Sequence, residues 1–221
     1  MLTKRININP YLIICLFFSL NLSIDFKTID SHEENHEYDM EFKKIQMISD
    51  EKNPELLWRM ARAYFNQAEK QYNQEEKNNF FYSAYNYSKQ ALNLDSNLAK
   101  ANHWYAVLHG QIGLIEGTKQ KIINSYDVLK YGKIAIDLDP SYDNTHHLLG
   151  RLNFELANLS WLEKNIASWV YETPPEGTFE QARDYFEAAI KLNPEDIRHL
   201  LWLGKTYILL EQKNKAQKLL I

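Results

Sequence analysis

Residues 131–141, Tyr-Gly-Lys-Ile-Ala-Ile-Asp-Leu-Asp-Pro-Ser, occur three times in recognisable form and decide the fold. The other copies are residues 87–97, Tyr-Ser-Lys-Gln-Ala-Leu-Asn-Leu-Asp-Ser-Asn, and residues 185–195, Tyr-Phe-Glu-Ala-Ala-Ile-Lys-Leu-Asn-Pro-Glu. Each copy has the pattern of a helix end, because Pro140 and Pro194 cannot continue a helix and push the preceding residue out of the helical region. A repeated helix end predicts stacked helix pairs that bury each other's apolar faces.

The C-terminal part of the chain fits the tetratricopeptide repeat consensus most closely. Counting from Ile197, its first helix has the expected bulky, Leu, Gly and Tyr positions, and a small residue follows in the second helix: Leu200, Leu203, Gly204, Tyr207 and Ala216. Counting back from Pro194, the preceding second helix carries Ala189, Phe186 and Ala182. Small residues are needed at these positions because the two helices of a unit cross closely there.

The same register gives about four units, the first beginning at Asn53 as an N-cap. Their first helices carry Ala61, Ala106, Gly150 and Gly204 at the small position, and their second helices carry Ala84, Val128, Ala182 and Ala216. The first three units contain insertions between these positions. Insertions of about three helical turns lengthen a helix pair without turning its apolar face outward. We therefore predict an all-α tetratricopeptide-like helical-repeat solenoid with over-long helix pairs over residues 53–221.

Two features of this array are irregular. In the third unit, residues 159–171 predict an extra helical stretch before the turn sequence Thr-Pro-Pro-Glu-Gly at residues 173–177. The fourth unit stops within its second helix at Ile221. Repeat arrays need a polar terminal cap, so we expect either a truncated chain or an end that another element covers.

Residues 1–24 predict a targeting or anchor segment. Lys4 and Arg5 precede the apolar run of residues 11–24, which resembles a signal sequence or signal anchor and is shorter than the ~20 residues of a spanning helix. We expect a membrane-targeting or anchoring role. A cleaved export signal is the main alternative, followed by an incidental apolar strand.

Residues 25–52 are acidic and polar and predict a solvated linker. His32 and His36 with their acidic neighbours could in principle hold a metal ion there. The segment lacks apolar residues to support such a site, so a tether is the better interpretation.

The composition limits the possible functions. With 45% apolar and 24% charged residues the chain is globular, and a net charge of -4 does not favour nucleic acid as a partner. The single cysteine, Cys15, lies outside the repeats, so the repeats lack a thiol for a disulfide, a nucleophile or a Cys-containing zinc site. The sequence contains no His-Glu-x-x-His pattern and no nucleophile elbow. We expect no enzyme activity, no catalytic residue, no cofactor and no metal.

A glycine-rich break at residues 110–117 precedes a helix for which we predict Thr118 as the N-cap. This is not a phosphate loop, because the order is Gly-Thr-Lys rather than Gly-Lys-Thr and the preceding segment is helical. Lys119 and Lys121 in the first turn oppose the positive end of the helix dipole, and a bound anion would relieve that conflict. A plain capped turn is the better interpretation, and an anion site is the alternative.

This helix is also the most basic of the chain, with Lys119, Lys121, Lys130 and Lys133. It could contact an acidic protein tail or an anionic bilayer, although a solvated helix face is the better interpretation. The five tryptophans exceed what a core needs, so some of them could line a concave groove for a peptide or acyl chain. The candidates are Trp104, Tyr105, Trp161 and Trp169.

Residues 53–221 resemble the regulator of microtubule dynamics family. The resemblance lies in residues 104–108 with 117–126, residues 148–157 with 159–167, and residues 200–205. It implies divergent tetratricopeptide-like repeats. It also implies association with microtubules or the spindle for some members, and attachment to the cytosolic face of an organelle membrane, mitochondrial or endoplasmic reticulum, for others.

We therefore expect a non-catalytic scaffold or adaptor associated with microtubules and tethered to an organelle membrane. Its expected partners are tubulin or another protein, with anionic phospholipid as a further possibility. The alternative is a phospholipid-binding or transfer domain at organelle contact sites, which would use an apolar groove and the basic edge between Lys119 and Lys133.

Overall fold

The computed structural model describes residues 24–48, 50, 52–159 and 175–219. All regular structure in these ranges is helical, which confirms the all-α prediction. The helices, in chain order, are α2 (Phe26–Glu34), α3 (Tyr38–Gln46), α4 (Pro54–Lys70), α5 (Gln74–Leu94), α6 (Ala99–Glu116), α7 (Thr118–Leu138), α8 (Asp143–Ala157), α10 (Phe179–Leu192), α11 (Ile197–Leu209) and α12 (Lys213–Lys218).

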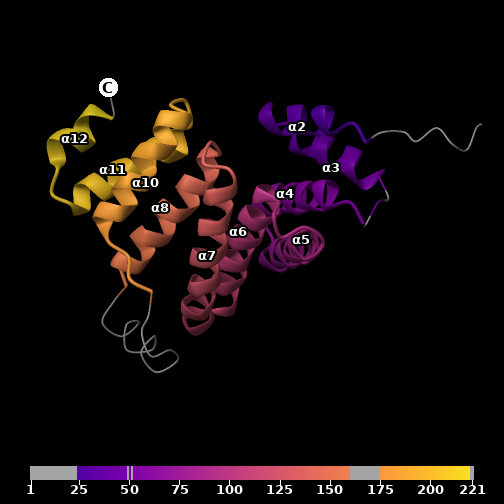
Figure 1. Ribbon diagram of the computed structural model, residues 1–221, viewed down its shortest axis with the longest axis horizontal. Helices are drawn as coiled ribbons and strands as arrows, with labels where there is room; N and C mark the ends of the chain where they lie inside the picture. Colours follow the sequence, from indigo (N-terminus) through magenta and orange to yellow (C-terminus); the bar gives the residue numbers. More distant parts are fainter. Residues whose placement is uncertain (1–23, 49, 51, 160–174, 220–221) are drawn as a thin grey trace, which may run out of the picture.

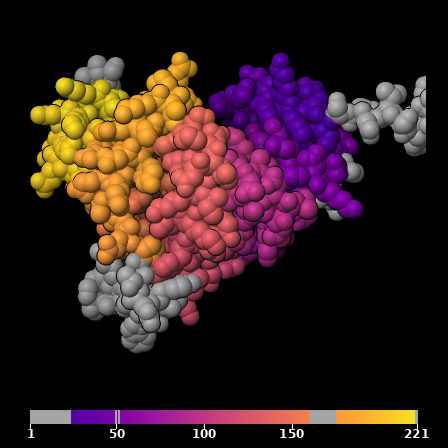
Figure 2. All heavy atoms as spheres, in the orientation of Figure 1, coloured from indigo at the N-terminus to yellow at the C-terminus, as the bar shows by residue number. Residues whose placement is uncertain are grey.

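The helices pack in pairs, α4 with α5, α6 with α7, α8 with α10 and α11 with α12. Figure 1 shows these pairs following one another from α4 to α12, with α2 and α3 over α4. The surface keeps the same order, from indigo at the N-terminal helices to yellow at α12 (Figure 2). Helices α5 and α7 have 21 residues each, whereas α10 has 14 and α11 has 13. The predicted over-long pairs are thus confirmed for the first two units.

The repeated sequence does end three helices, α5, α7 and α10. In each copy the Asp or Asn after the helix leaves the helical conformation, and its backbone N–H donates to the carbonyl of the repeated Ala: Asp95 to Ala91, Asp139 to Ala135 and Asn193 to Ala189. At the other end, Asn53 caps α4 by accepting from the backbone N–H groups of Glu55 and Leu56, as predicted.

The start of α7 corrects one prediction. Its N-cap is Gly117, with φ of 97°, and Thr118 is the first helical residue, without a side-chain capping bond. Glycine adopts this positive φ without strain, whereas threonine does not. The chain therefore turns one residue earlier than Thr118.

The small residues at the crossings are required to different degrees. A Cβ on Gly150 would lie 2.7 Å from the ring of Phe186, which is fully buried in α10. A Cβ on Gly204, at the equivalent position of α11, would have no heavy atom within 4 Å. Close packing thus explains the glycine in α8 but not the one in α11.

Residues 25–52 are not the solvated linker that we predicted. Most of the described part of this segment forms α2 and α3, whose Ile29 and Ile45 are fully buried with Leu56 and Ala63 of α4. His32 Nδ1 lies 2.6 Å from Glu37 Oε2, whereas His36 Nδ1 lies 2.9 Å from the hydroxyl of Tyr38. The two histidines thus have separate partners and do not meet as a metal site would require. These two helices cover the first helix of the array.

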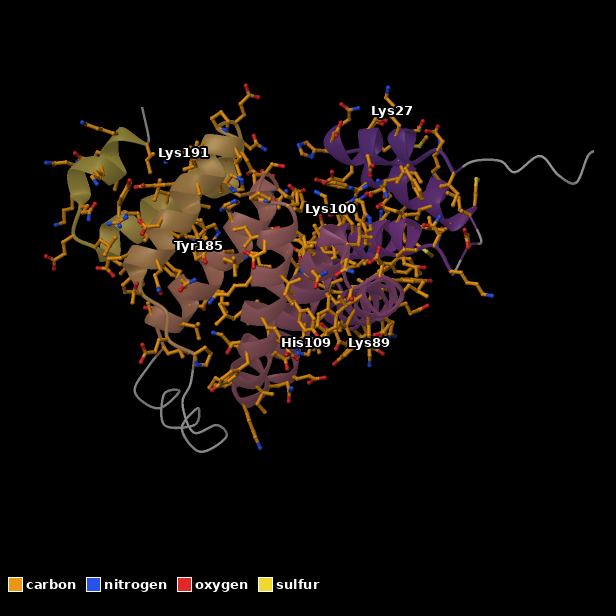
Figure 3. The ribbon with its side chains drawn as sticks, in the orientation of Figure 1. Lys27, Lys89, Lys100, His109, Tyr185 and Lys191 are labelled. Carbon is orange, nitrogen blue, oxygen red and sulfur yellow. The ribbon has the colours of Figure 1, made fainter. Side chains whose placement is uncertain are left out.

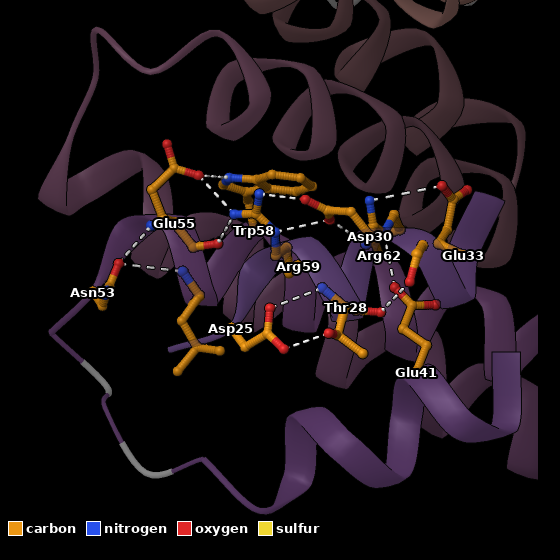
Figure 4. Close-up of polar contacts among 12 residues, drawn as sticks. Asp25, Thr28, Asp30, Glu33, Glu41, Asn53, Glu55, Trp58, Arg59 and Arg62 are labelled. Atoms are coloured by element: carbon orange, nitrogen blue, oxygen red, sulfur yellow. Dashed lines mark hydrogen bonds and ion pairs between the residues drawn. The ribbon is translucent and has the colours of Figure 1, made fainter. Parts of the chain in front are cut away.

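Charged contacts hold α2 and α3 on α4 (Figure 4). Arg59 and Arg62 of α4 both donate to Asp30 of α2, at 2.6 and 2.8 Å, and Arg62 Nε donates to Glu41 Oε1 of α3 at 2.8 Å. The Glu41 side chain is fully buried, and burial raises its pKa while Arg62 and Asn66 oppose that rise. The acidic composition of residues 25–52 thus reflects complementarity to α4. We call these contacts the N-terminal ion cluster.

None of the helices within the described ranges is long and apolar enough to cross a membrane. The predicted targeting segment, residues 1–24, lies outside the described residues except for Ile24.

Candidate functional site

A groove lies where α6, α7 and α8 meet, in the middle of the array. It holds a cavity of about 180 Å³ and widens to about 860 Å³ when the open space at its mouth is counted. Its lining is mainly apolar and comes chiefly from these three helices, including Val107, Gly110, Leu114, Ile122, Val128, Leu148, Leu152 and Leu156. The groove is therefore a concave site that could take an apolar group.

The groove lies where an aromatic pair is missing. In the first and third units, the first helix carries a phenylalanine, Phe65 or Phe154, four residues after its small position. In the second and fourth units, the first helix carries a tryptophan, Trp104 or Trp202, two residues before its small position. The ring centroids are 5.6 Å apart in the edge-on Phe65–Trp104 pair and 5.2 Å apart in the edge-on Phe154–Trp202 pair.

The step from α6 to α8 has neither aromatic residue. Its two positions are Gly110 and Leu148, and both line the groove. Gly110 leaves little room for a side chain of its own, because a Cβ there would lie 3.3 Å from Cγ2 of Val128. The groove thus follows from two substitutions in a repeated packing contact.

The charged groups at the groove are unequally paired. Lys121 Nζ lies 3.2 Å from Glu155 Oε2, and both residues line the groove. Arg151, which also lines it, is exposed and has no ion pair among the described residues. Its guanidinium carbon lies 4.4 Å from the ring centroid of Trp202, and Lys205 Nζ lies at the same distance. Burial by surrounding atoms lowers the pKa of Arg151, whereas the charges of Glu155 and Glu69 oppose that shift.

The four predicted lysines do not form a single site. Lys121 faces the groove, whereas Lys119, Lys130 and Lys133 are exposed and form no ion pair within the described ranges. Spacings of 11 and 3 residues place these three on one side of α7. We call them the basic stripe. The intervening Asp127 contacts His109, with 3.5 Å between Oδ2 and Nε2. The exposed Thr118 lies at the start of the same helix.

The predicted aromatic groove is placed differently. Trp104 is 8% exposed and belongs to the core of α4, α5 and α6, and Tyr105 is 9% exposed with its ring centroid 4.7 Å from that of Tyr131. Neither lines the groove. Trp161 and Trp169 lie outside the described residues. Sequence reasoning missed Gly110, Leu148 and Arg151, although the register that it established identifies the missing Phe and Trp.

A second polar group lies between α8 and α11. His199 is fully buried, its Nε2 lies 3.0 Å from Asp143 Oδ2, and its Nδ1 lies 2.9 Å from Nδ1 of His147. Oxygen atoms of Asp143 and Asp196 and one nitrogen of His199 lie within 4.8 Å of one another, a spacing that a metal ion could bridge. The guanidinium of Arg198 already pairs with Asp196, so a cation is present at this point. We assign these residues to a hydrogen-bonded contact between units.

Two histidines, the buried His103 of α6 and the partly buried His147 of α8, predict acid sensitivity. Burial, with Lys100 next in effect, lowers the pKa of His103 to about 3, and burial with His199 next lowers that of His147 to about 3. Both values lie below the ordinary histidine pKa of 6.5, so between about pH 3 and pH 6.5 the unfolded chain binds more protons than the folded chain does. The contribution of these two neutral histidines to the free energy of unfolding is complete above pH 6.5 and is lost as the pH falls towards 3. Each histidine contributes a slope of up to ~1.4 kcal/mol per pH unit.

Urea unfolding at a series of pH values between 7.5 and 5 measures this slope. Replacing His103 and His147 with Gln should flatten it. A free energy of unfolding that is equally pH-dependent in this double variant would contradict the assignment.

Comparisons with known proteins agree with the fold. The sequence model described as regulator of microtubule dynamics protein 1-3 matches residues 24–221. Over 185 residues the chain is 35% identical to regulator of microtubule dynamics protein 1 of Bos taurus, covering 83% of this chain and 58% of that protein. Over 197 residues it is 30% identical to the protein of the same name from Caenorhabditis elegans, covering 88% and 87%. The chain thus spans less than two thirds of the mammalian relative.

Solved structures show the same architecture at low sequence identity. A thermophilic TPR protein of Thermus thermophilus superposes with a TM-score of 0.56 at 10% identity, covering 81% of this chain and 78% of that one. The MamA protein superposes with a TM-score of 0.51 at 15% identity, covering 87% and 84%. These likenesses confirm the tetratricopeptide-like fold.

Proposed function

The chain belongs to the regulator of microtubule dynamics family, and we propose that it is a non-catalytic helical scaffold that associates with microtubules. The observation that supports a contact with microtubules is the basic stripe on α7. Its three lysines are exposed and without ion pairs in the described chain, so their charge is available to a partner. The net charge of the chain is -4, so an acidic partner must be attracted locally rather than by the whole molecule.

Reversing the charge of the basic stripe should weaken microtubule binding. We expect the triple variant Lys119→Glu, Lys130→Glu, Lys133→Glu to lose at least ~10-fold in affinity for stabilised microtubules, because each lysine near an anionic surface contributes about 1 kcal/mol. Co-sedimentation across a salt series measures this. The unchanged chain should also bind less tightly as salt increases, since exposed charges are screened.

The matched control reverses three lysines elsewhere, Lys27, Lys89 and Lys191, which come from α2, α5 and α10 (Figure 3). This control changes the net charge equally but leaves the basic stripe intact. Equal losses of binding in both triple variants would show that total charge matters and would remove the basic stripe from the proposal.

We further propose that residues 1–24 tether the scaffold to the cytosolic face of an organelle membrane. The support is the basic flank and apolar run of this segment. The folded domain would then begin near residue 25, because α2 and α3 pack on the array. Membrane fractionation of cells expressing the chain with and without residues 1–24 tests the tether, and an equal membrane fraction for both would contradict it.

Phospholipid binding is the second candidate function, and the apolar groove with Lys121 and Arg151 at its rim is the observation that favours it. The cavity of about 180 Å³ is smaller than the ~300–1,000 Å³ of ordinary small-molecule sites, so it would take the end of an acyl chain rather than a whole lipid. Flotation with phosphatidylserine-containing vesicles tests this function separately from microtubule binding.

A further inference from the structure

The repeated Phe–Trp contact shows what kind of group fits between neighbouring first helices. Where the pair is present, a phenyl ring from one helix and an indole from the next pack in a T-shaped arrangement, as in Phe65–Trp104 and Phe154–Trp202. Edge-on aromatic packing of this kind is favourable beyond the burial of apolar area. At the step from α6 to α8 the chain supplies Gly110 and Leu148 instead, and the space remains open.

We propose that this groove receives an aromatic side chain of a partner peptide and that Arg151 binds a carboxylate next to that side chain. The ring would take the place that the chain's own Phe and Trp fill at the other two steps. Phe65 lines the groove and offers an aromatic wall to an incoming ring. This proposal goes beyond microtubule association and does not depend on it.

The charge at the rim selects for an acidic neighbour. Glu155 forms an ion pair with Lys121, whereas no carboxylate of the described chain lies within ion-pair distance of Arg151, and Glu155 and Glu69 act on it only from further away. The ring of Trp202 lies 4.4 Å from the Arg151 guanidinium carbon, which positions the guanidinium beside the groove. A guanidinium can bind a carboxylate through two parallel hydrogen bonds, and such charge-assisted bonds are stronger than neutral ones. The partner is therefore a peptide segment in which an aromatic residue adjoins Asp or Glu.

The size of the cavity favours a side chain over a lipid. About 180 Å³ suits a single ring better than the two acyl chains of a phospholipid. The lysines of the basic stripe, a further candidate contact for a headgroup, do not line the groove. We therefore argue for the peptide and treat lipid binding as an outcome of the test.

The test uses the full chain and three capped dipeptides, acetyl-Phe-Glu-amide, acetyl-Ala-Glu-amide and acetyl-Phe-Gln-amide. Shifts of backbone amide signals in a nuclear magnetic resonance titration give the affinities. We expect acetyl-Phe-Glu-amide to bind at millimolar concentration and to shift the Gly110 amide. Loss of either the ring or the carboxylate should weaken binding by about 10-fold or more.

Variants of the chain locate the site. Leu148→Trp should abolish binding, because it fills the groove with the residue type found at Trp104 and Trp202. Arg151→Gln should lower the affinity for acetyl-Phe-Glu-amide to that for acetyl-Phe-Gln-amide. Lys205→Gln is the matched control, since Lys205 contacts the same indole but does not line the groove, and it should leave binding unchanged.

Three results would overturn the proposal. The first is equal binding of the alanine and phenylalanine dipeptides. The second is unchanged binding in the Leu148→Trp chain, provided that its circular dichroism spectrum matches that of the parent. The third is no dipeptide binding together with vesicle flotation that Leu148→Trp abolishes, which would assign the groove to lipid. Loss of microtubule binding by the basic-stripe variant would bear on none of these results.

Discussion

Replacing Arg62 with Ala should lower the free energy of unfolding by about 3–5 kcal/mol, because it leaves the buried Glu41 carboxylate without its cation. Asp30 and Glu33 lose a partner in the same step. Burial opposes a charge on Arg62, yet Glu41, Glu33 and Asp30 together raise its pKa, so the guanidinium stays charged in the fold. The full chain is unfolded in urea and followed by far-ultraviolet circular dichroism.

The control for this prediction is an exposed ion pair. Arg183 pairs with Asp184, whose side chain is 64% exposed, so Arg183→Ala should cost only about 0–1 kcal/mol. Amide hydrogen exchange shows which helices lose stability. Amides of α2 and α3 should exchange faster in the Arg62 variant than those of α10. If both variants lose the same small amount of stability, the N-terminal ion cluster does not hold the two helices on α4.

Replacing Gly150 with Leu should lower the free energy of unfolding by about 3 kcal/mol, at the upper end of overpacking costs. Any Cβ at this position comes within 2.7 Å of the Phe186 ring, and the ring is itself fully buried. The helices α8 and α10 must therefore separate. For a chain of this length the loss corresponds to a melting temperature lower by about 6–12 °C.

The same substitution at Gly204 is the matched control. This glycine has the equivalent register position in α11, but a Cβ there meets no atom within 4 Å. Leucine is also a better helix former than glycine by roughly 0.5–1 kcal/mol. We therefore expect Gly204→Leu to keep or raise stability. Equal destabilisation by both substitutions would show that the crossing at Gly150 is less tight than its geometry indicates.

The parts of the fold that were predictable from the sequence are those that local residues determine. The helix ends after Leu94, Leu138 and Leu192 depend on a few neighbouring residues, and so does the cap at Asn53. The position of the small residues follows from the repeat register. Local pattern failed by one residue at Thr118, because the positive φ belongs to the glycine before it.

The parts that were not predictable depend on contacts between distant segments. The sequence alone indicates that Asp30 and Glu41 are solvated acids, because it does not show that Arg59 and Arg62 lie beside them in the fold. The apolar residues of α2 and α3, Ile29 and Ile45 among them, are too few to stand out in a polar segment. The groove could have been predicted from the sequence, since Gly110 and Leu148 replace the Phe–Trp pair that joins neighbouring first helices at the other two steps of the array.

The N-terminal ion cluster also restricts how this protein can evolve. An apolar cluster such as the one that contains Ile29 and Ile45 tolerates stepwise exchange among similar side chains at small cost. The pairing of Glu41 with Arg62 does not, because either single change leaves a buried charge. Descendants should therefore keep both residues or replace both, and the intermediate genotype should be rare. The junction between α3 and α4 is thus expected to change in pairs, while the apolar residues around it drift singly.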